Sequence, residues 1–179
     1  MNNRSALRGI VIASMAYAMV ACTQGASASG GNGAGTSAAS ATGAAADTQG
    51  WIANGATACD KYLTPDFVGQ IFKSSAGHSK KLGAQGCQFE APDFASISIT
   101  LAAGGLAVFD AHQKYLDNPT PLPGVGDKAV RFNKTSIEAV KGANRMCGID
   151  VMPPFGNKLS GEALAQKLGE VCNKLFALP

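Results

Sequence analysis

Large hydrophobic residues divide this chain into three stretches with different patterns. Residues 10–21 form one apolar run, whereas residues 23–50 contain no aromatic residue and no aliphatic side chain larger than alanine. From Trp51 to Pro179, large apolar residues recur with the spacings of helices and strands. The pattern therefore predicts one folded domain at residues 51–179, preceded by two segments that do not contribute to its core.

Three segments of this domain have the apolar spacing of an amphipathic helix. The first follows Thr64-Pro65-Asp66, which supplies a capping residue, a proline at the first helical position and an acid in the first turn. The second covers residues 106–116, and its expected buried side consists of Leu106, Phe109 and Leu116. The third is capped by Ser160, and its apolar stripe consists of Leu164, Leu168, Val171, Cys172 and Leu175.

Five segments have the pattern of β-strands, at residues 87–90, 96–101, 128–132, 136–141 and 145–152. The clearest is Ser96–Leu101, in which apolar and polar residues alternate strictly. Gly142-Ala143-Asn144 separates the last two strands with residues that tolerate positive φ. The predicted order is helix, two strands, helix, three strands, helix. This order is typical of an α+β domain with a mostly antiparallel sheet of about five strands and about three helices.

The N-terminal stretch has the pattern of a secretory signal peptide, with Arg4 and Arg8 ahead of the apolar run. The run is too short to span a bilayer, which takes about 20 apolar residues. Met19-Val20-Ala21-Cys22 resembles the bacterial lipobox, which implies that residues 1–21 are removed and that Cys22 is acylated. Two alternatives stay open, an uncleaved signal anchor and ordinary cleavage after Ala16-Tyr17-Ala18.

The lipobox resemblance implies an exported protein that is anchored in the lipid bilayer through Cys22. By resemblance to the sorting rule of enteric Gram-negative lipoproteins, Thr23 favours the outer membrane. Residues 23–50 cannot bury enough apolar surface to offset the entropy of ordering, so residues 22–50 are expected to be a disordered Gly/Ala/Ser tether. Its expected root-mean-square span is roughly 30 Å.

Net charge gives no reason to expect a nucleic-acid partner. The full chain has 15 basic and 12 acidic side chains, and loss of Arg4 and Arg8 with the signal peptide leaves 13 against 12. A net charge of about +1 provides no basic surface for phosphates.

The four cysteines of the domain, Cys59, Cys87, Cys147 and Cys172, form an even set in an exported chain and predict two disulfides. Spacing alone leaves three pairings open. Cys147 shares strand parity with the apolar face of the last strand, and Cys172 lies in the apolar stripe of the last helix. We therefore expect Cys147 to pair with Cys172, which leaves Cys59 for Cys87. Zinc binding is not expected, because no two cysteines are closely spaced.

Three motifs resemble a broad group of small bacterial lipoproteins, known mainly as domains of unknown function and including a set common in actinobacteria. They are the cysteine before Leu63-Thr64-Pro65, the segment Cys87-Gln88-Phe89, and the Gly-x-Gly-Asp turn in residues 122–129. The resemblance covers residues 57–177. It implies an α+β domain closed by a C-terminal amphipathic helix, and it supports the first disulfide. It supplies no catalytic residues, and Cys147 and Cys172 lie outside its pattern.

No residue pattern indicates catalysis, a metal or a cofactor. His78 and His112 are the only histidines, and no Gly-x-Ser-x-Gly nucleophile motif is present. The expected function is a non-catalytic binding or accessory module for a protein or cell-envelope component, peptidoglycan included. The alternative is an envelope hydrolase or an enzyme-inhibitor domain, because a fold can assemble a carboxylate pair that sequence does not show.

Candidate binding residues are few. Trp51 is the only tryptophan, and it is expected to cover the edge of the domain or, alternatively, to stack on a carbohydrate. The loops with Pro123, Val125, Pro154 and Phe155 are apolar and rigid. Exposed apolar loops are typical of protein contacts, so these residues are the predicted binding surface.

Overall fold

The structure is a computed structural model, and it describes residues 47–153, 159 and 161–179. The predictions for the signal peptide, for Cys22 and for most of the tether lie outside the described residues, as do those for Pro154, Phe155 and Ser160. Residues 47–53 are helical, so the last four residues of the expected tether belong to a helix.

The core of the fold is a seven-stranded antiparallel sheet with the strand order β1-β2-β3-β7-β6-β5-β4. The strands are β1 (His78–Lys81), β2 (Gly86–Glu90), β3 (Ser96–Ala102), β4 (Thr120–Pro121), β5 (Lys128–Phe132), β6 (Ser136–Lys141) and β7 (Arg145–Met152). The α+β prediction is confirmed, but the expected count of five strands is wrong. The two unpredicted strands, β1 and β4, are the edges of the sheet, and their mostly exposed side chains carry no alternating pattern.

The described residues contain five helices where three were predicted. They are α1 at residues 47–53, α2 (Gly55–Tyr62), α3 (Pro65–Ile71), α4 (Leu106–Gln113) and α5 (Gly161–Phe176). The predicted start of α3 is confirmed, because the Thr64 hydroxyl accepts a hydrogen bond from the Phe67 N–H. The segment that forms α1 and α2 was missed because its glycines and alanines give only a weak apolar stripe.

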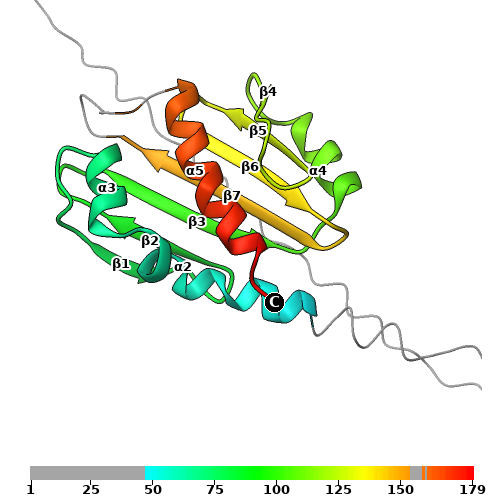
Figure 1. The fold of residues 1–179 in the computed structure, drawn as a ribbon, viewed down its shortest axis with the longest axis horizontal. Helices are drawn as coiled ribbons and strands as arrows, with labels where there is room; N and C mark the ends of the chain where they lie inside the picture. Colours follow the sequence, from blue (N-terminus) through cyan, green and yellow to red (C-terminus); the bar gives the residue numbers. More distant parts are fainter. Residues whose placement is uncertain (1–46, 154–158, 160) are drawn as a thin grey trace, which may run out of the picture. The chain divides into compact units, whose positions relative to one another are not determined.

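One face of the sheet carries the main core. Figure 1 shows α5 running across the strands, with α2 and α3 beside it over β1, β2 and β3. The predicted stripe of α5 is buried in full, together with the inward residues of β3 and β7. At its centre lie Ile97, Ile99, Leu101, Ile149, Leu164, Leu168 and Leu175, all fully buried.

Helix α4 packs on the opposite face and covers only part of it. Its buried Phe109 contacts a small second core of Val130, Val140 and Met146, which come from β5, β6 and β7. Leu106 was predicted to be buried with Phe109, but it is 47% exposed because α4 meets the sheet along a single row of side chains. The remainder of this face is polar and carries Gln88, Ser98, Thr100 and Asp150.

Two disulfides join the layers, as the cysteine count predicted. Cys59 pairs with Cys87 and so joins α2 to β2, whereas Cys147 pairs with Cys172 and joins β7 to α5. Both bridges lie in the core, so all four domain cysteines are buried structural residues.

The loop before β5 fastens α5 to the sheet. The Asn173 side chain on α5 accepts a hydrogen bond from the Gly126 N–H and donates one to the Gly124 carbonyl. Asp127 accepts a hydrogen bond from the Gly142 N–H at 2.7 Å, which ties the loop to the β6–β7 turn. The Gly-x-Gly-Asp turn therefore has a structural role, with Gly126 in the left-handed region at φ 57°.

Candidate functional site

Backbone strain is concentrated at one end of the sheet, which we call the hairpin end. There β2 turns into β3, β5 turns into β6, and β7 ends at Met152, which is paired with Ser96. The described non-glycine residues with positive φ are Asp93, Phe94, Asn118, Asn133 and Lys134. All five line one of two hollows. Holding a non-glycine residue at positive φ costs of order 1–3 kcal/mol of conformational free energy, and such residues cluster at functional sites. The hairpin end is therefore the candidate site.

The first hollow, which we call the Phe94 hollow, lies at the β2–β3 turn and has a volume of about 670 Å³. Its apolar wall is made by Phe94 and Met152, which are 94% and 61% exposed. His78, Gln88, Glu90 and Ser96 supply hydrogen-bonding groups from the polar face of the sheet. An apolar wall with a few polar groups is the usual composition of a binding site.

Phe94 occupies a position that favours glycine. The Ala95 N–H donates to the Pro92 carbonyl, and the two central residues of this turn, Asp93 and Phe94, have φ of 63° and 61°. Two-residue turns with positive φ at both positions strongly prefer sequences such as Asp-Gly. Here the second position carries a phenylalanine, and its side chain has almost no contact that repays the strain.

The polar side of the Phe94 hollow is organised around Glu90. Its carboxylate pairs with Lys80 and lies 3.4 Å from Nε2 of His78. The hydrogen bond from Lys80 lowers the pKa of Glu90 below its usual value, and this effect outweighs the opposing effect of burial. Glu90 is therefore ionised at neutral pH and already has a partner, so the contact surface left in the hollow is its apolar wall together with Gln88 and Ser96.

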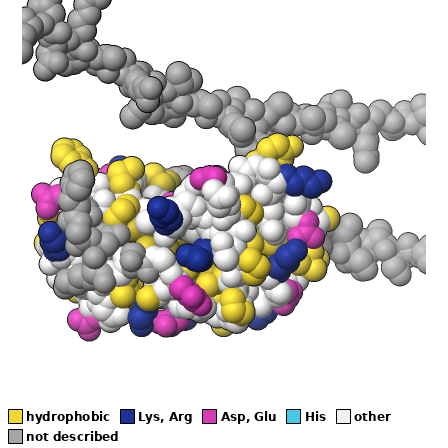
Figure 2. Space-filling view, turned by 90° about the horizontal axis from the view of Figure 1, so that it is seen from above, with side chains coloured by type: hydrophobic (Ala, Val, Ile, Leu, Met, Phe, Trp, Pro, Cys, Tyr) yellow, Lys and Arg dark blue, Asp and Glu magenta, His cyan; other side chains and the backbone are white. Residues whose placement is uncertain are grey.

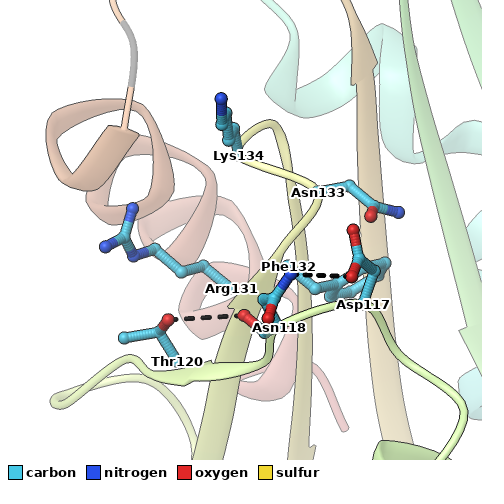
Figure 3. A pocket seen from close by; sticks show the side chains of 7 residues that line it. All are labelled: Asp117, Asn118, Thr120, Arg131, Phe132, Asn133 and Lys134. Atoms are coloured by element: carbon cyan, nitrogen blue, oxygen red, sulfur yellow. Dashed lines mark hydrogen bonds between the residues drawn. The ribbon is translucent and has the colours of Figure 1, made fainter.

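The second hollow, which we call the Arg131 hollow, lies between the α4–β4 connection and the β5–β6 turn and has a volume of about 450 Å³. Figure 3 shows Arg131 and Lys134 extending away from Asp117 and Asn118. The Asp117 carboxylate instead accepts a hydrogen bond from the Asn118 amide at 2.7 Å. The basic and acidic groups that line this hollow therefore form no ion pair with one another.

A buried carboxylate lies beneath α4. Glu138 on β6 is within 2.6 Å of Nδ1 of His112, and its other oxygen has no hydrogen-bond partner among the described residues. Burial raises the pKa of Glu138, the nearby Asp150 adds to this rise, and His112 opposes it. Neither His112 nor Glu138 lines the two hollows. Strand parity alone does not reveal this pair, because β6 is buried on both faces.

The structure separates the sequence-predicted binding residues. Trp51 is fully buried, stacks on Phe176 and donates its indole N–H to the Ala102 carbonyl, so the carbohydrate-stacking interpretation is wrong. Val125 is only 3% exposed because it packs against Gly169 of α5, so it is a core residue rather than a contact residue. Pro123 is exposed, but it lines neither of the two hollows.

The hairpin end was missed by sequence analysis. Asp93-Phe94 lies in the short connection between the predicted strands at residues 87–90 and 96–101. The large side chain of Phe94 in this connection was the one sequence signal that could have indicated the site. The Arg131 hollow has no such signal, because residues 117–120 and 131–134 meet only in the folded sheet.

Surface charge on the described residues is mixed. Figure 2 shows basic and acidic side chains interspersed with apolar ones over the face seen from above. The described residues contain no cluster of three or more potential metal ligands. Among the same residues, no helix is long and apolar enough to cross a membrane.

Comparisons with known proteins give no relative. No protein-family model matches the chain, and no curated protein and no solved structure matches it. The fold and the two hollows therefore define the protein as an α+β domain with a candidate binding end.

Proposed function

We propose that this protein is a non-catalytic binding module of the bacterial cell envelope, related to the small lipoproteins whose motifs it resembles. In this proposal Cys22 holds it in the membrane, and the Phe94 hollow contacts an envelope protein. The observation that supports the proposal is Phe94 itself, a strained aromatic side chain that is 94% exposed. Strain of this kind persists at ligand contacts, and exposed aromatic anchors dominate protein interfaces.

The first test removes this anchor and relaxes its backbone in one step. Phe94→Gly in the full chain should lower capture of the partner by roughly 30-fold, because loss of an aromatic anchor costs about 2 kcal/mol of binding. The same substitution should raise the free energy of unfolding by about 1 kcal/mol, since glycine adopts positive φ without strain. Partner capture is measured by cross-linking in the native envelope, and stability by denaturant unfolding.

Tyr115→Ala is the matched control, because Tyr115 is 85% exposed and lines neither hollow. It should leave capture unchanged. Equal capture by the wild type and by Phe94→Gly would show that the Phe94 hollow is not the contact site. Turnover of an envelope substrate by the purified chain, with no partner captured, would favour the hydrolase alternative. Retention on isolated peptidoglycan would identify a glycan instead of a protein as the ligand.

The membrane anchor has a separate test. Cys22→Ala removes the thiol that the lipobox resemblance assigns to acylation. The variant should lose membrane retention and be recovered in the soluble fraction, because nothing then supplies the buried acyl chains. Fractionation of cells followed by detection of the chain measures this outcome. Unchanged membrane retention would favour the uncleaved signal anchor.

A further inference from the structure

We propose that the Arg131 hollow binds an oxyanion, a phosphate or a carboxylate group of a ligand. The inference goes beyond the proposed function, because it concerns different residues and does not depend on Phe94. The hollow has a volume of about 450 Å³, and it is lined by two cations, two amides, the hydroxyl of Thr120 and one carboxylate, that of Asp117.

Arg131 and Arg145, the two arginines in the described residues, differ in whether their guanidinium groups have partners. Both are partly buried. Arg145 donates to the carbonyls of Phe176 and Leu178 and to Asp47, and its guanidinium also lies over the ring of Trp51. The Arg131 guanidinium has no hydrogen bond or ion pair to any described residue. A partly buried guanidinium with five free donors is suited to a planar or tetrahedral oxyanion.

The two cations that line this hollow outnumber its single carboxylate, Asp117. All 12 acidic side chains fall within residues 47–170, and each of them is described. None forms an ion pair with Arg131 or Lys134, and the one carboxylate at the hollow, Asp117, is engaged by Asn118. Because no described acid pairs with these two cations, their hydrogen-bond donors are available to an anion from outside the chain.

The first turn of α5 places a second positive group close to Arg131, which favours binding of an anion there. Nη1 of Arg131 lies 3.9 Å from the position of a β-carbon on Gly161, the first residue of α5. The N-terminal end of a helix is positive and has free N–H groups, so a cation placed there is repelled. Glu162 is in this turn but does not pair with Arg131 in the described structure. A bound oxyanion would reverse the repulsion, because it contacts both positive groups.

The β5–β6 turn places Lys134 at the same hollow. Asn133 and Lys134 have φ of 50° and 64°, and Asn118, across the hollow, has φ of 49°. Three strained residues around one small volume hold two amides and an ammonium at its rim. This cost of ordering is repaid when a ligand uses the donors, which is the usual reason for strain at a binding site.

The test measures anion binding to the full chain, with inorganic phosphate and acetate as the probes and chloride at equal ionic strength as the reference. Either probe should raise the melting temperature of the wild type, because a ligand that binds only the folded state stabilises it. NMR titration should shift the amide signals of Asn133 and Lys134. Arg131→Gln should weaken binding roughly tenfold, since it removes charge-assisted hydrogen bonds. Lys134→Gln should weaken it less.

Lys81→Gln is the matched control, because it removes the same charge from an exposed lysine on the edge strand β1, which is separated from β5 by the four strands β2, β3, β7 and β6. It should bind like the wild type. Without added anion, Arg131→Gln should melt no lower than the wild type, since it relieves a repulsion. If Arg131→Gln does not fold, anion binding is compared instead between the wild type and Lys134→Gln, whose substituted residue lies on the exposed turn. Response to phosphate alone identifies a phosphate ligand, and response to acetate alone identifies a carboxylate. Either result supports the site.

Two results would overturn the inference. One is the absence of any response to both probes beyond that seen with chloride. The other is an undiminished response in Arg131→Gln and Lys134→Gln, which would place the anion elsewhere. Both results are independent of partner capture through Phe94, so the two proposals fail separately.

Discussion

At the scale of single residues, the described chain contains one carboxylate whose burial works against the fold. Glu138 is on the central part of the sheet, beneath α4, and its side chain is 9% exposed. His112 satisfies only one of its oxygens. Removing a carboxylate from water without full hydrogen bonding costs free energy, which is why its pKa is raised. Asp110 pairs with Lys128, and His112 is the described side chain that contacts Glu138.

The raised pKa predicts a pH dependence of stability. The folded state holds the Glu138 proton more tightly than the unfolded state, so this residue favours folding below its unfolded pKa, and that contribution is lost as pH rises through the folded pKa. Glu138→Gln removes the titration and keeps an oxygen for His112. Its free energy of unfolding, relative to the wild type, should therefore be higher at pH 7 than at pH 4. Denaturant unfolding at both pH values measures this difference. The exposed Glu162→Gln is the control, and a Glu138→Gln difference that falls between pH 4 and pH 7 would contradict the assignment.

At the scale of elements, α5 and the loop before β5 fit together through a notch. Gly169 on the buried side of α5 leaves space that the Val125 side chain occupies. A β-carbon at position 169 would overlap this side chain. The Asn173 hydrogen bonds lie one turn further along α5, so the loop contacts the helix at two successive turns.

The notch makes a prediction about paired substitutions. Gly169→Ala should lower the free energy of unfolding by about 1–3 kcal/mol, because overpacking outweighs the higher helix propensity of alanine. Val125→Ala alone should also destabilise the protein, since it leaves a cavity. In the double variant, the new methyl group fills part of that cavity, so the combined loss should be smaller than the sum. A double-mutant cycle measures this coupling, and strict additivity would show that the two side chains do not compete for the same space.

At the scale of the whole molecule, each of the two disulfides attaches a different part of the helical layer to the sheet. The Cys59–Cys87 bridge secures the N-terminal helices against β2, and the Cys147–Cys172 bridge secures α5 against β7. The sequence separations are 28 and 25 residues, so the two loops removed from the unfolded ensemble are nearly equal.

This near equality predicts similar stabilisation by the two bridges. Replacing either pair with alanines should lower the free energy of unfolding by about 3 kcal/mol. Denaturant unfolding of the two double variants measures both losses. If removal of one bridge lowers the free energy of unfolding by less than about 1 kcal/mol, the unfolded chain is already conformationally restricted between those two cysteines. The single variants Cys147→Ala and Cys172→Ala serve as controls, because each should lose the same bridge.

Local patterns account for most of the elements. The alternation in Ser96–Leu101, the glycine turn at Gly142 and the cap at Thr64 each depend on residues close in sequence, and each predicted element is present. Edge strands were missed because they bury few side chains. Leu106 was misplaced because helical periodicity identifies a stripe without revealing how wide the contact is.

The sequence by itself determined the α+β class, five strands and three helices of this protein, and the even set of four cysteines, and its resemblance to a lipobox predicts a membrane anchor. Only the tertiary structure decided that Trp51 and Val125 belong to the core, that the strained turns meet at one end of the sheet, and that Arg131 is left without an acid. The physical reason is that hydrophobic period and capping act over a few residues. Solvent exposure, strain and charge pairing depend instead on which distant segments the antiparallel register brings together.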